Sequence, residues 1–418
     1  MSTTTSTIET RRLACGMDLI VEPIAGVRSV GMSWLVAGGS AREPSDQEGL
    51  GAMWSELLFR GAGGRDAREH ADALDRLGAS RNANVQTYFM RLSSVMLGSR
   101  VHDALPLLAD MVTSPAMDAS SIEPVRDLCV QSIEALADDP HERVMLLARE
   151  KHVDEPLNRS GMGRIDSIES LSRERLTDGW RDVAKPQGSA IAFAGDVDAD
   201  AIESRLNALL EDWEGEAPGI ETGASAPRGY HHQTDETNQV HIAIAHDAPK
   251  ELDEASMCER VVIAALSGGM SGRLFTEVRE KRGLVYSVNA SYGPSRDFGR
   301  VAAYAGTTPE RAQETLDVML EQLQLLSAAG GDALRQDEFD RAVVGMKSNL
   351  VMSGESTSAR AGALGTDWFR RGAARTLQDV ADEIDALTLD QVNAHIAQRE
   401  LGALTIATIG PAALQASL

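Results

Sequence analysis

The sequence predicts an α+β protein with two homologous domains, each an antiparallel sheet packed with helices. Three observations support this prediction. The chain has 418 residues, of which 43% are hydrophobic, and this is enough for more than one core. Segments with strand-like alternation are interspersed with segments of helical period. The order strand, helix, helix, strand, strand, helix, helix occurs twice, which indicates an internal repeat.

Alternating apolar residues predict the strands, and apolar residues at helical spacing predict the helices. Glycines separate them: Gly16 follows the first strand, Gly38 and Gly39 end the third, and Gly61 ends the first helix. The predicted strands are 11–15, 18–22, 28–37, 80–86, 89–97, 188–195, 240–245, 284–291, 300–305 and 403–409. The predicted helices are 45–60, 66–77, 102–112, 120–137, several within 141–183, 198–211, 254–266, 271–279, 309–326 and 335–352, with further helices between 352 and the last strand.

A segment without periodicity separates the two repeats. Residues 214–229 are rich in Gly, Pro, Ala and acidic residues, which is typical of a linker. We therefore predict an N-terminal domain over 1–213 and a C-terminal domain over 230–418.

Charge and composition exclude several classes of partner. The chain has 63 acidic and 40 basic residues, a net charge of −23, which disfavours nucleic acid and anionic membranes. No segment is long and apolar enough for a membrane span, and the N-terminal residues lack the apolar segment of a secretory signal. The three cysteines are too far apart for a disulfide framework or a zinc pair. We expect a cytoplasmic protein with no nucleic-acid or membrane partner.

One helical segment indicates a family. Residues 48–62, EGLGAMWSELLFRGA, resemble the zinc-binding helix of the M16 (pitrilysin/insulinase-like) metallopeptidases, in particular the short forms and the subunits of the mitochondrial processing peptidase. The similarity continues through PLLADMVTSP, SGGMSGRLFTEVREKRGLVYSV, YAGTTPERA and SGESTSARAGALG, and so covers nearly the whole chain. It implies a clamshell in which two halves of this chain's size, each with two domains, close around a peptide.

The zinc motif of that family is replaced in this chain. Its pattern is H-x-x-E-H, with two histidines four apart on one helix face, a glutamate as general base, and a third ligand from a later helix. The positions that match the first histidine, the base and the second histidine are Ala52, Ser55 and Glu56. The position that matches the third ligand is Ser132. We therefore predict no metal site and no cofactor in this chain.

The other half of the family's catalytic apparatus is retained. Active members have an Arg and a Tyr seven residues apart in the C-terminal domain, and Arg279 and Tyr286 match them. By resemblance, the arginine would hold a main-chain carbonyl of the substrate, and the tyrosine hydroxyl would donate to the oxyanion of the tetrahedral intermediate. Taken alone, such residues are usually a solvated cation and a packing residue, but the intact block around them favours the functional interpretation.

Two functions follow from the resemblance. In the first, the chain is the non-zinc subunit of a heterodimeric peptidase and supplies Arg279 and Tyr286 in trans to a zinc-bearing partner that cleaves peptides. In the alternative, it is a catalytically inactive structural or peptide-binding homologue, like the respiratory-complex core subunits that share this fold. The natural peptide stays open, as does the formation of a homodimer in isolation.

Overall fold

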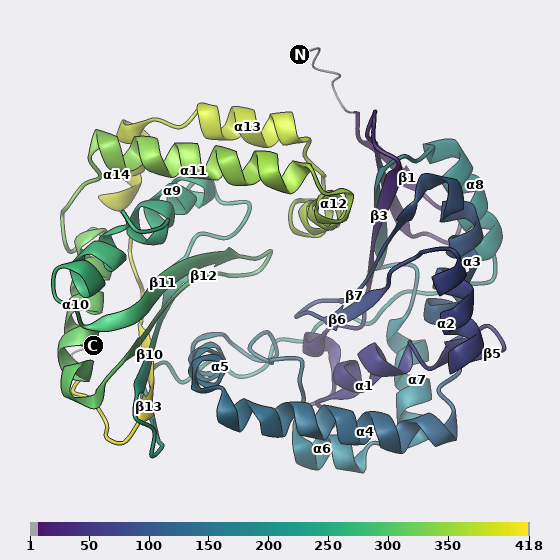
Figure 1. Cartoon of the computed structure of the whole chain (residues 1–418), viewed down its shortest axis with the longest axis horizontal. Helices are drawn as coiled ribbons and strands as arrows, with labels where there is room; N and C mark the ends of the chain where they lie inside the picture. Colours follow the sequence, from purple (N-terminus) through teal and green to yellow (C-terminus); the bar gives the residue numbers. More distant parts are fainter. Residues whose placement is uncertain (1–6, 417–418) are drawn as a thin grey trace. The chain divides into compact units, whose positions relative to one another are not determined.

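The computed structural model describes residues 7–416 and contains two compact units. Unit 1 comprises residues 7–135, 155–224 and 353–376, and unit 2 comprises 136–154, 225–352 and 377–416. Each unit has one large sheet packed with helices (Figure 1). The predicted α+β class with two domains is confirmed.

The sheet of unit 1 has six strands in the order β1-β2-β8-β3-β7-β6. Neighbouring strands are antiparallel except β2 and β8, so the sheet is mixed rather than purely antiparallel. Parallel pairing is possible here because a long, largely helical connection separates the two strands. The strands are β1 (Glu9–Arg12), β2 (Asp18–Pro23), β3 (Ser29–Val36), β6 (Asn82–Val85), β7 (Met90–Leu97) and β8 (Ala190–Gly195), with a small separate hairpin of β4 (Gly61–Ala62) and β5 (Arg65–Asp66).

Helices cover the main core of unit 1. Trp34, Trp54 and Phe193 are among its largest fully buried side chains. At the start of α2, the Asp66 carboxylate accepts from the backbone of Glu69 and the Glu69 side chain accepts from the backbone of Asp66, a capping box that fixes the helix start. The helices are α1 (Leu50–Leu57), α2 (Ala67–Arg76), α3 (Val101–Thr113), α4 (Ala119–Glu134), α6 (Ile165–Ser170), α7 (Arg173–Val183) and α8 (Ala199–Leu209).

A helix from the second half of the sequence, α12 (Thr357–Arg371), packs on the sheet of unit 1. Small residues permit the close approach: a Cβ at Gly31 would lie 2.2 Å from the Thr357 carbonyl oxygen. Glu22 and Arg360 form a buried ion pair that joins strand and helix. The helix is therefore an integral part of this unit.

The sheet of unit 2 has five strands in the order β11-β12-β10-β13-β9. It is also mixed, because β13 and β9 are parallel whereas the other neighbours are antiparallel. The strands are β9 (Gly229–Thr234), β10 (Val240–Ala248), β11 (Val285–Pro294), β12 (Gly299–Thr307) and β13 (Thr405–Gly410). The helices are α9 (Ser256–Ser267), the π-helical segment η4 (Phe275–Glu280), α10 (Ala312–Leu325), α11 (Gln336–Gly354), α13 (Leu377–Asp385) and α14 (Leu389–Ile396).

The helix α5 (Pro140–His152), from the first half of the sequence, packs on the sheet of unit 2. Its residues Val144, Leu147 and Ala148 contact Ala243 and Tyr304 in a small buried cluster. Each unit thus contains one helix from the other half of the sequence, and the compact units differ in these segments from the continuous ranges predicted from the repeat. In the described part of the chain, no helix is long and apolar enough to cross a bilayer.

Candidate functional site

Arg279 and Tyr286 are brought together by a turn between η4 and β11. The π-helical geometry shows in the Lys281 N–H, which donates to the Thr276 carbonyl oxygen five residues back at 2.9 Å. Gly283, at φ 61°, reverses the chain in a conformation that favours glycine, and β11 begins two residues later. This reversal places two residues that are seven apart in sequence against each other.

Two aromatic rings hold the Arg279 side chain. Its guanidinium carbon lies 5.1 Å from the centroid of the Tyr286 ring and 4.8 Å from that of Phe275. Such contacts orient a guanidinium and leave its charge unneutralised. Among residues 7–416, no carboxylate forms an ion pair with Arg279. Its N–H groups are therefore available to a carbonyl oxygen of a ligand.

The neighbouring cations behave differently. Lys281 and Arg282 both pair with the Glu277 carboxylate, at 2.6 Å and 2.8 Å. The hydrogen bond from Lys281, and after it that from Arg282, lower the pKa of Glu277, so this carboxylate stays charged and engaged. Arg279 thus differs from the two basic residues that follow it on the chain.

A β-bulge presents Tyr286. Val285 lies opposite Thr307 on β12, and Ser287 lies opposite the adjacent Gly306, so Tyr286 is an extra residue in β11. A bulge interrupts the regular alternation of side chains and re-aims the extra one. Tyr286 is 85% exposed, unusual for a large aromatic residue in a strand. The bulge therefore presents the phenol to solvent.

Unit 1 contains the four positions that the resemblance matches to the zinc motif. They lie on α1 and α4, which pack against each other. Ala52 is partly buried against the core, and the Ser55 hydroxyl donates to its carbonyl oxygen at 2.8 Å. The Ser132 hydroxyl donates to the Leu128 carbonyl oxygen, also at 2.8 Å. Glu56 supplies the one carboxylate of the four positions.

These residues do not fit a zinc ion. Zinc sites use imidazole, thiolate and carboxylate ligands, whereas the two serine hydroxyls here bond to carbonyls of their own helices. Burial, and after it the charge of Glu56, raise the pKa of the Cys129 thiol on α4 to about 11, so the free side chain is a neutral thiol. No group of three or more His, Cys, Asp or Glu within residues 7–416 is placed to hold a metal ion.

The N-terminus of α1 is capped by a buried carboxylate that lies outside the motif. Glu43, 6% exposed, accepts from the backbone N–H of Gly49 at 2.9 Å and of Gly51 at 2.8 Å. These N–H groups belong to the first turn and need a partner. Burial raises the pKa of Glu43 to about 7 despite these bonds. No spacing in the sequence indicates this residue, because it precedes the helix by several positions.

We expect Glu43→Gln to change how the stability of unit 1 depends on pH. The folded-state pKa lies above the ordinary value of 4.5, so the contribution of Glu43 is fully present below pH 4.5 and is lost as the pH rises through 7. The difference in unfolding free energy, wild type minus variant, should therefore fall between pH 5 and pH 8. Urea unfolding followed by tryptophan fluorescence measures this, because all five tryptophans lie in unit 1. If the difference in unfolding free energy stays constant or rises between pH 5 and pH 8, the raised pKa of Glu43 is contradicted.

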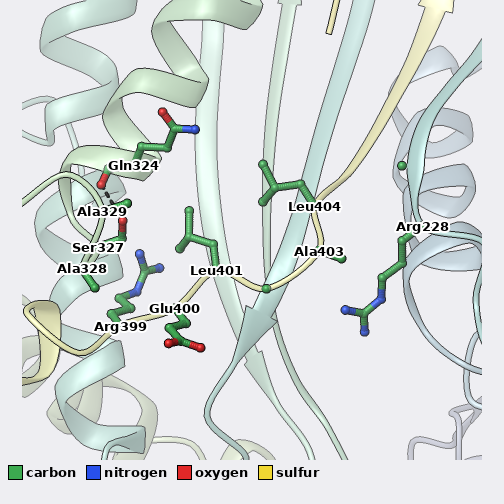
Figure 2. A pocket seen from close by; sticks show the side chains of 12 residues that line it. Arg228, Gln324, Ser327, Ala328, Ala329, Arg399, Glu400, Leu401, Ala403 and Leu404 are labelled. Atoms are coloured by element: carbon green, nitrogen blue, oxygen red, sulfur yellow. Dashed lines mark hydrogen bonds between the residues drawn. The ribbon is translucent and has the colours of Figure 1, made fainter. Parts of the chain in front are cut away.

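A pocket of about 680 Å³ lies in unit 2 (Figure 2), and neither Arg279 nor Tyr286 lines it. In the close-up, Arg399 and Arg228 lie on opposite sides of Leu401. Both guanidiniums are neutralised: Arg399 binds Glu259 at 2.8 Å, and Arg228 binds Asp247 at 2.5 Å. The pocket therefore offers no free cation. Its lining consists of Arg228, Gly229, Gln324, Ser327, Ala328, Ala329, Arg399, Glu400, Leu401, Gly402, Ala403 and Leu404.

Two family models place the chain in peptidase family M16. A model described as insulinase (peptidase family M16) matches residues 22–163, and one described as the peptidase M16 inactive domain matches residues 170–346. An uncharacterized zinc protease of Bacillus subtilis, YmxG, is 26% identical over 410 residues, which cover 96% of this chain and 98% of that protein. An uncharacterized zinc protease of Mycobacterium tuberculosis is 29% identical over 415 residues, with 96% and 93% covered.

Solved structures agree on the fold. The peptidase M16 inactive domain from Pseudomonas fluorescens superposes with a TM-score of 0.87 at 22% identity, covering 99% of this chain and 100% of that one. A protease from Helicobacter pylori superposes with a TM-score of 0.85 at 18% identity, covering 97% and 100%. The predicted family is confirmed, and the roles of Arg279 and Tyr286 stay predictions.

Sequence reasoning missed the second ring of the site. Phe275 lies four residues before Arg279, a spacing that brings two residues of a helix onto one face. That spacing was a usable signal, because arginine beside an aromatic ring is a common pairing. The bulge at Tyr286 has no comparable signal, since it depends on the register with β12.

Proposed function

We propose that this chain is the non-zinc subunit of a two-chain peptidase of family M16. It supplies Arg279 and Tyr286 to peptides that a zinc-bearing partner chain cleaves. The observation that supports this most directly is the contrast between the two units. An oriented, unneutralised arginine and an exposed tyrosine are held together in unit 2, whereas α1 and α4 in unit 1 lack a donor set for zinc.

The pair has the chemistry of a substrate and oxyanion contact. The guanidinium of Arg279 offers several N–H donors in a fixed plane, which suits a main-chain carbonyl. The Tyr286 hydroxyl offers one O–H donor, which is worth most against charge that develops in the transition state. Both groups are oriented by the same ring contact before any substrate binds. The metal chemistry and the activated water would come from the partner chain.

The proposal is tested by reconstitution. The zinc-bearing chain, this chain and an equimolar mixture are each assayed on a pool of unstructured fluorogenic peptides. We expect cleavage by the mixture alone, and its loss on addition of a zinc chelator. The alternative from the sequence, a structural or peptide-binding homologue, predicts that this chain leaves cleavage by the other chain unchanged. Cleavage by this chain alone would contradict both functions.

A further inference from the structure

One face of β11 is exposed and polar along its whole length. Ser287, Asn289, Ser291 and Gly293 alternate with residues that pack toward the core, and all four are exposed. We call these four residues the β11 strip. It begins next to Tyr286 and ends at Gly293, on the outermost strand of the sheet. Small polar side chains of this kind let an extended chain lie close to the strand.

Arg300 lies at the far end of the strip. On β12 it is the direct neighbour of Gly293 on one side and of Asp247 on the other. Gly293 leaves space beside it, since a Cβ there would have one neighbour within 4 Å, the Arg300 carbonyl oxygen at 3.7 Å. Asp247 is already engaged, with Arg228 at 2.5 Å and His152 at 3.4 Å.

The Arg300 guanidinium has no partner in the described chain. Its Nη1 is buried and makes no hydrogen bond, and its side chain forms no ion pair within residues 7–416. Burial, and after it the like charge of Arg149 on α5, lower the pKa of Arg300 to about 10, so it stays protonated at neutral pH. A poorly solvated cation beside a second cation is costly unless something compensates it.

The lack of a carboxylate partner for Arg300 is unusual in a chain with this composition. With 63 acidic residues to 40 basic ones, the chain has carboxylates in excess, and most of its other partly buried arginines use one. Buried charged groups normally have a partner within the protein, and exceptions are expected where a residue binds a ligand. The groups that would compensate Arg300 are then on the ligand.

We propose that Arg300 binds a carboxylate of the peptide substrate. The inference rests on the proposed function, since it uses Tyr286 to mark the cleaved bond. Gly293 lies seven positions after Tyr286, and a strand rises about 3.3 Å per residue, so Tyr286 and Gly293 are roughly 23 Å apart. An extended peptide over the strip would therefore place its carboxylate about seven residues from the cleaved bond. That carboxylate is an Asp or Glu side chain or the peptide's own C-terminus.

The test measures binding by the whole chain and does not depend on cleavage. The probes are fluorescent Ala/Ser/Gly peptides of about fourteen residues, which is long enough to span the strip in either direction. One set contains a single Asp, a second set contains Asn at the same position, and a third set contains neither residue. Each is made with a free and with an amidated C-terminus, which separates the two sources of the carboxylate. The chain variants are Arg300→Met, Arg300→Lys, and Arg341→Met on the exposed face of α11 as a matched control.

We expect wild type to bind the best acidic peptide roughly tenfold or more tightly than its neutral counterpart, as a charge-assisted contact should. Arg300→Met should abolish that preference, while Arg300→Lys should keep part of it and Arg341→Met all of it. The melting temperature of Arg300→Met should not fall, because the substitution removes an uncompensated charge. Equal binding of acidic and neutral peptides by wild type, no measurable binding of either, or a preference that survives Arg300→Met would each overturn the inference. If the reconstitution experiment shows no cleavage, these binding results can still be interpreted, because they measure peptide affinity and not cleavage.

Discussion

Tyr286→Phe should lower kcat of the two-chain peptidase by about 100-fold or more, with a smaller change in KM. The substitution removes the one hydroxyl donor of the pair and little volume. The phenylalanine ring can still contact the Arg279 guanidinium, which lies 5.1 Å from the ring centroid in wild type, so the arginine should keep its orientation. Steady-state kinetics of the reconstituted complex measure the loss.

The matched control is Tyr292→Phe on the same strand. Tyr292 lies on the core-facing side of β11, and its hydroxyl donates to the Pro249 carbonyl oxygen at 2.6 Å. This variant should lose about 1 kcal/mol of stability and retain its turnover. Unchanged kcat in Tyr286→Phe, or an equal loss in both variants, would refute the role we assign to the Tyr286 hydroxyl.

Glu259→Gln should destabilise unit 2 by about 3–5 kcal/mol, the largest stability effect that we expect. The Glu259 carboxylate is fully buried and accepts from two nitrogens of Arg399 at 2.8 Å and from His395 at 2.8 Å. The amide keeps the shape but leaves the Arg399 charge uncompensated in the core. Urea unfolding by far-ultraviolet circular dichroism measures the change, since unit 2 contains no tryptophan.

The buried cluster of Glu259, His395, Arg399 and His246 should also make unit 2 less stable in acid. Burial alone would raise the pKa of Glu259, but hydrogen bonds from His395 and Arg399 hold it at about 2, so its contribution is lost as the pH falls from 4.5 toward 2. Burial, and after it Arg399, lower the pKa of His246 to about 4, and this adds a loss between pH 6.5 and 4. In Glu259→Gln, the unfolding free energy should therefore depend less on pH between 4.5 and 2 than it does in wild type.

A surface pair serves as the control for this prediction. Asp337 and Arg341 form an exposed ion pair at 2.8 Å on α11, and solvent screens such pairs, so Asp337→Asn should leave the unfolding free energy of unit 2 nearly unchanged. A Glu259→Gln variant that is no less stable than Asp337→Asn would show that the buried cluster contributes nothing to the stability of unit 2.

Local patterns predicted most elements of the fold, but they did not predict that α5 packs on the sheet of unit 2 and α12 on the sheet of unit 1. The alternation in 89–97 and the helical period in 102–112 led to β7 and α3 almost residue for residue. The packing of α5 and α12 depends on contacts between residues far apart in sequence, which no local period encodes. The strand β9 was missed because GYHHQT has no alternation of apolar residues and follows a segment that resembles a linker.

The candidate site was predictable only as far as the motif extends. The resemblance located Arg279 and Tyr286 by their spacing, and the structure adds the rings and the bulge that orient them. Arg300 could not be found from sequence, because its significance lies in the lack of a side-chain partner among residues 7–416. That absence follows from the register, which places Gly293 on one side of Arg300 and an already engaged Asp247 on the other.

The most direct test of the divided active site is the composition of the native assembly. The chain is captured from its own cells, and the intact mass and zinc content of the complex are recorded together. We predict a complex of this chain, 44.8 kDa, with one different chain of similar size, and one zinc per complex that stays with the other chain after separation. A homodimer or monomer without zinc, or zinc that stays with this chain, would contradict the account.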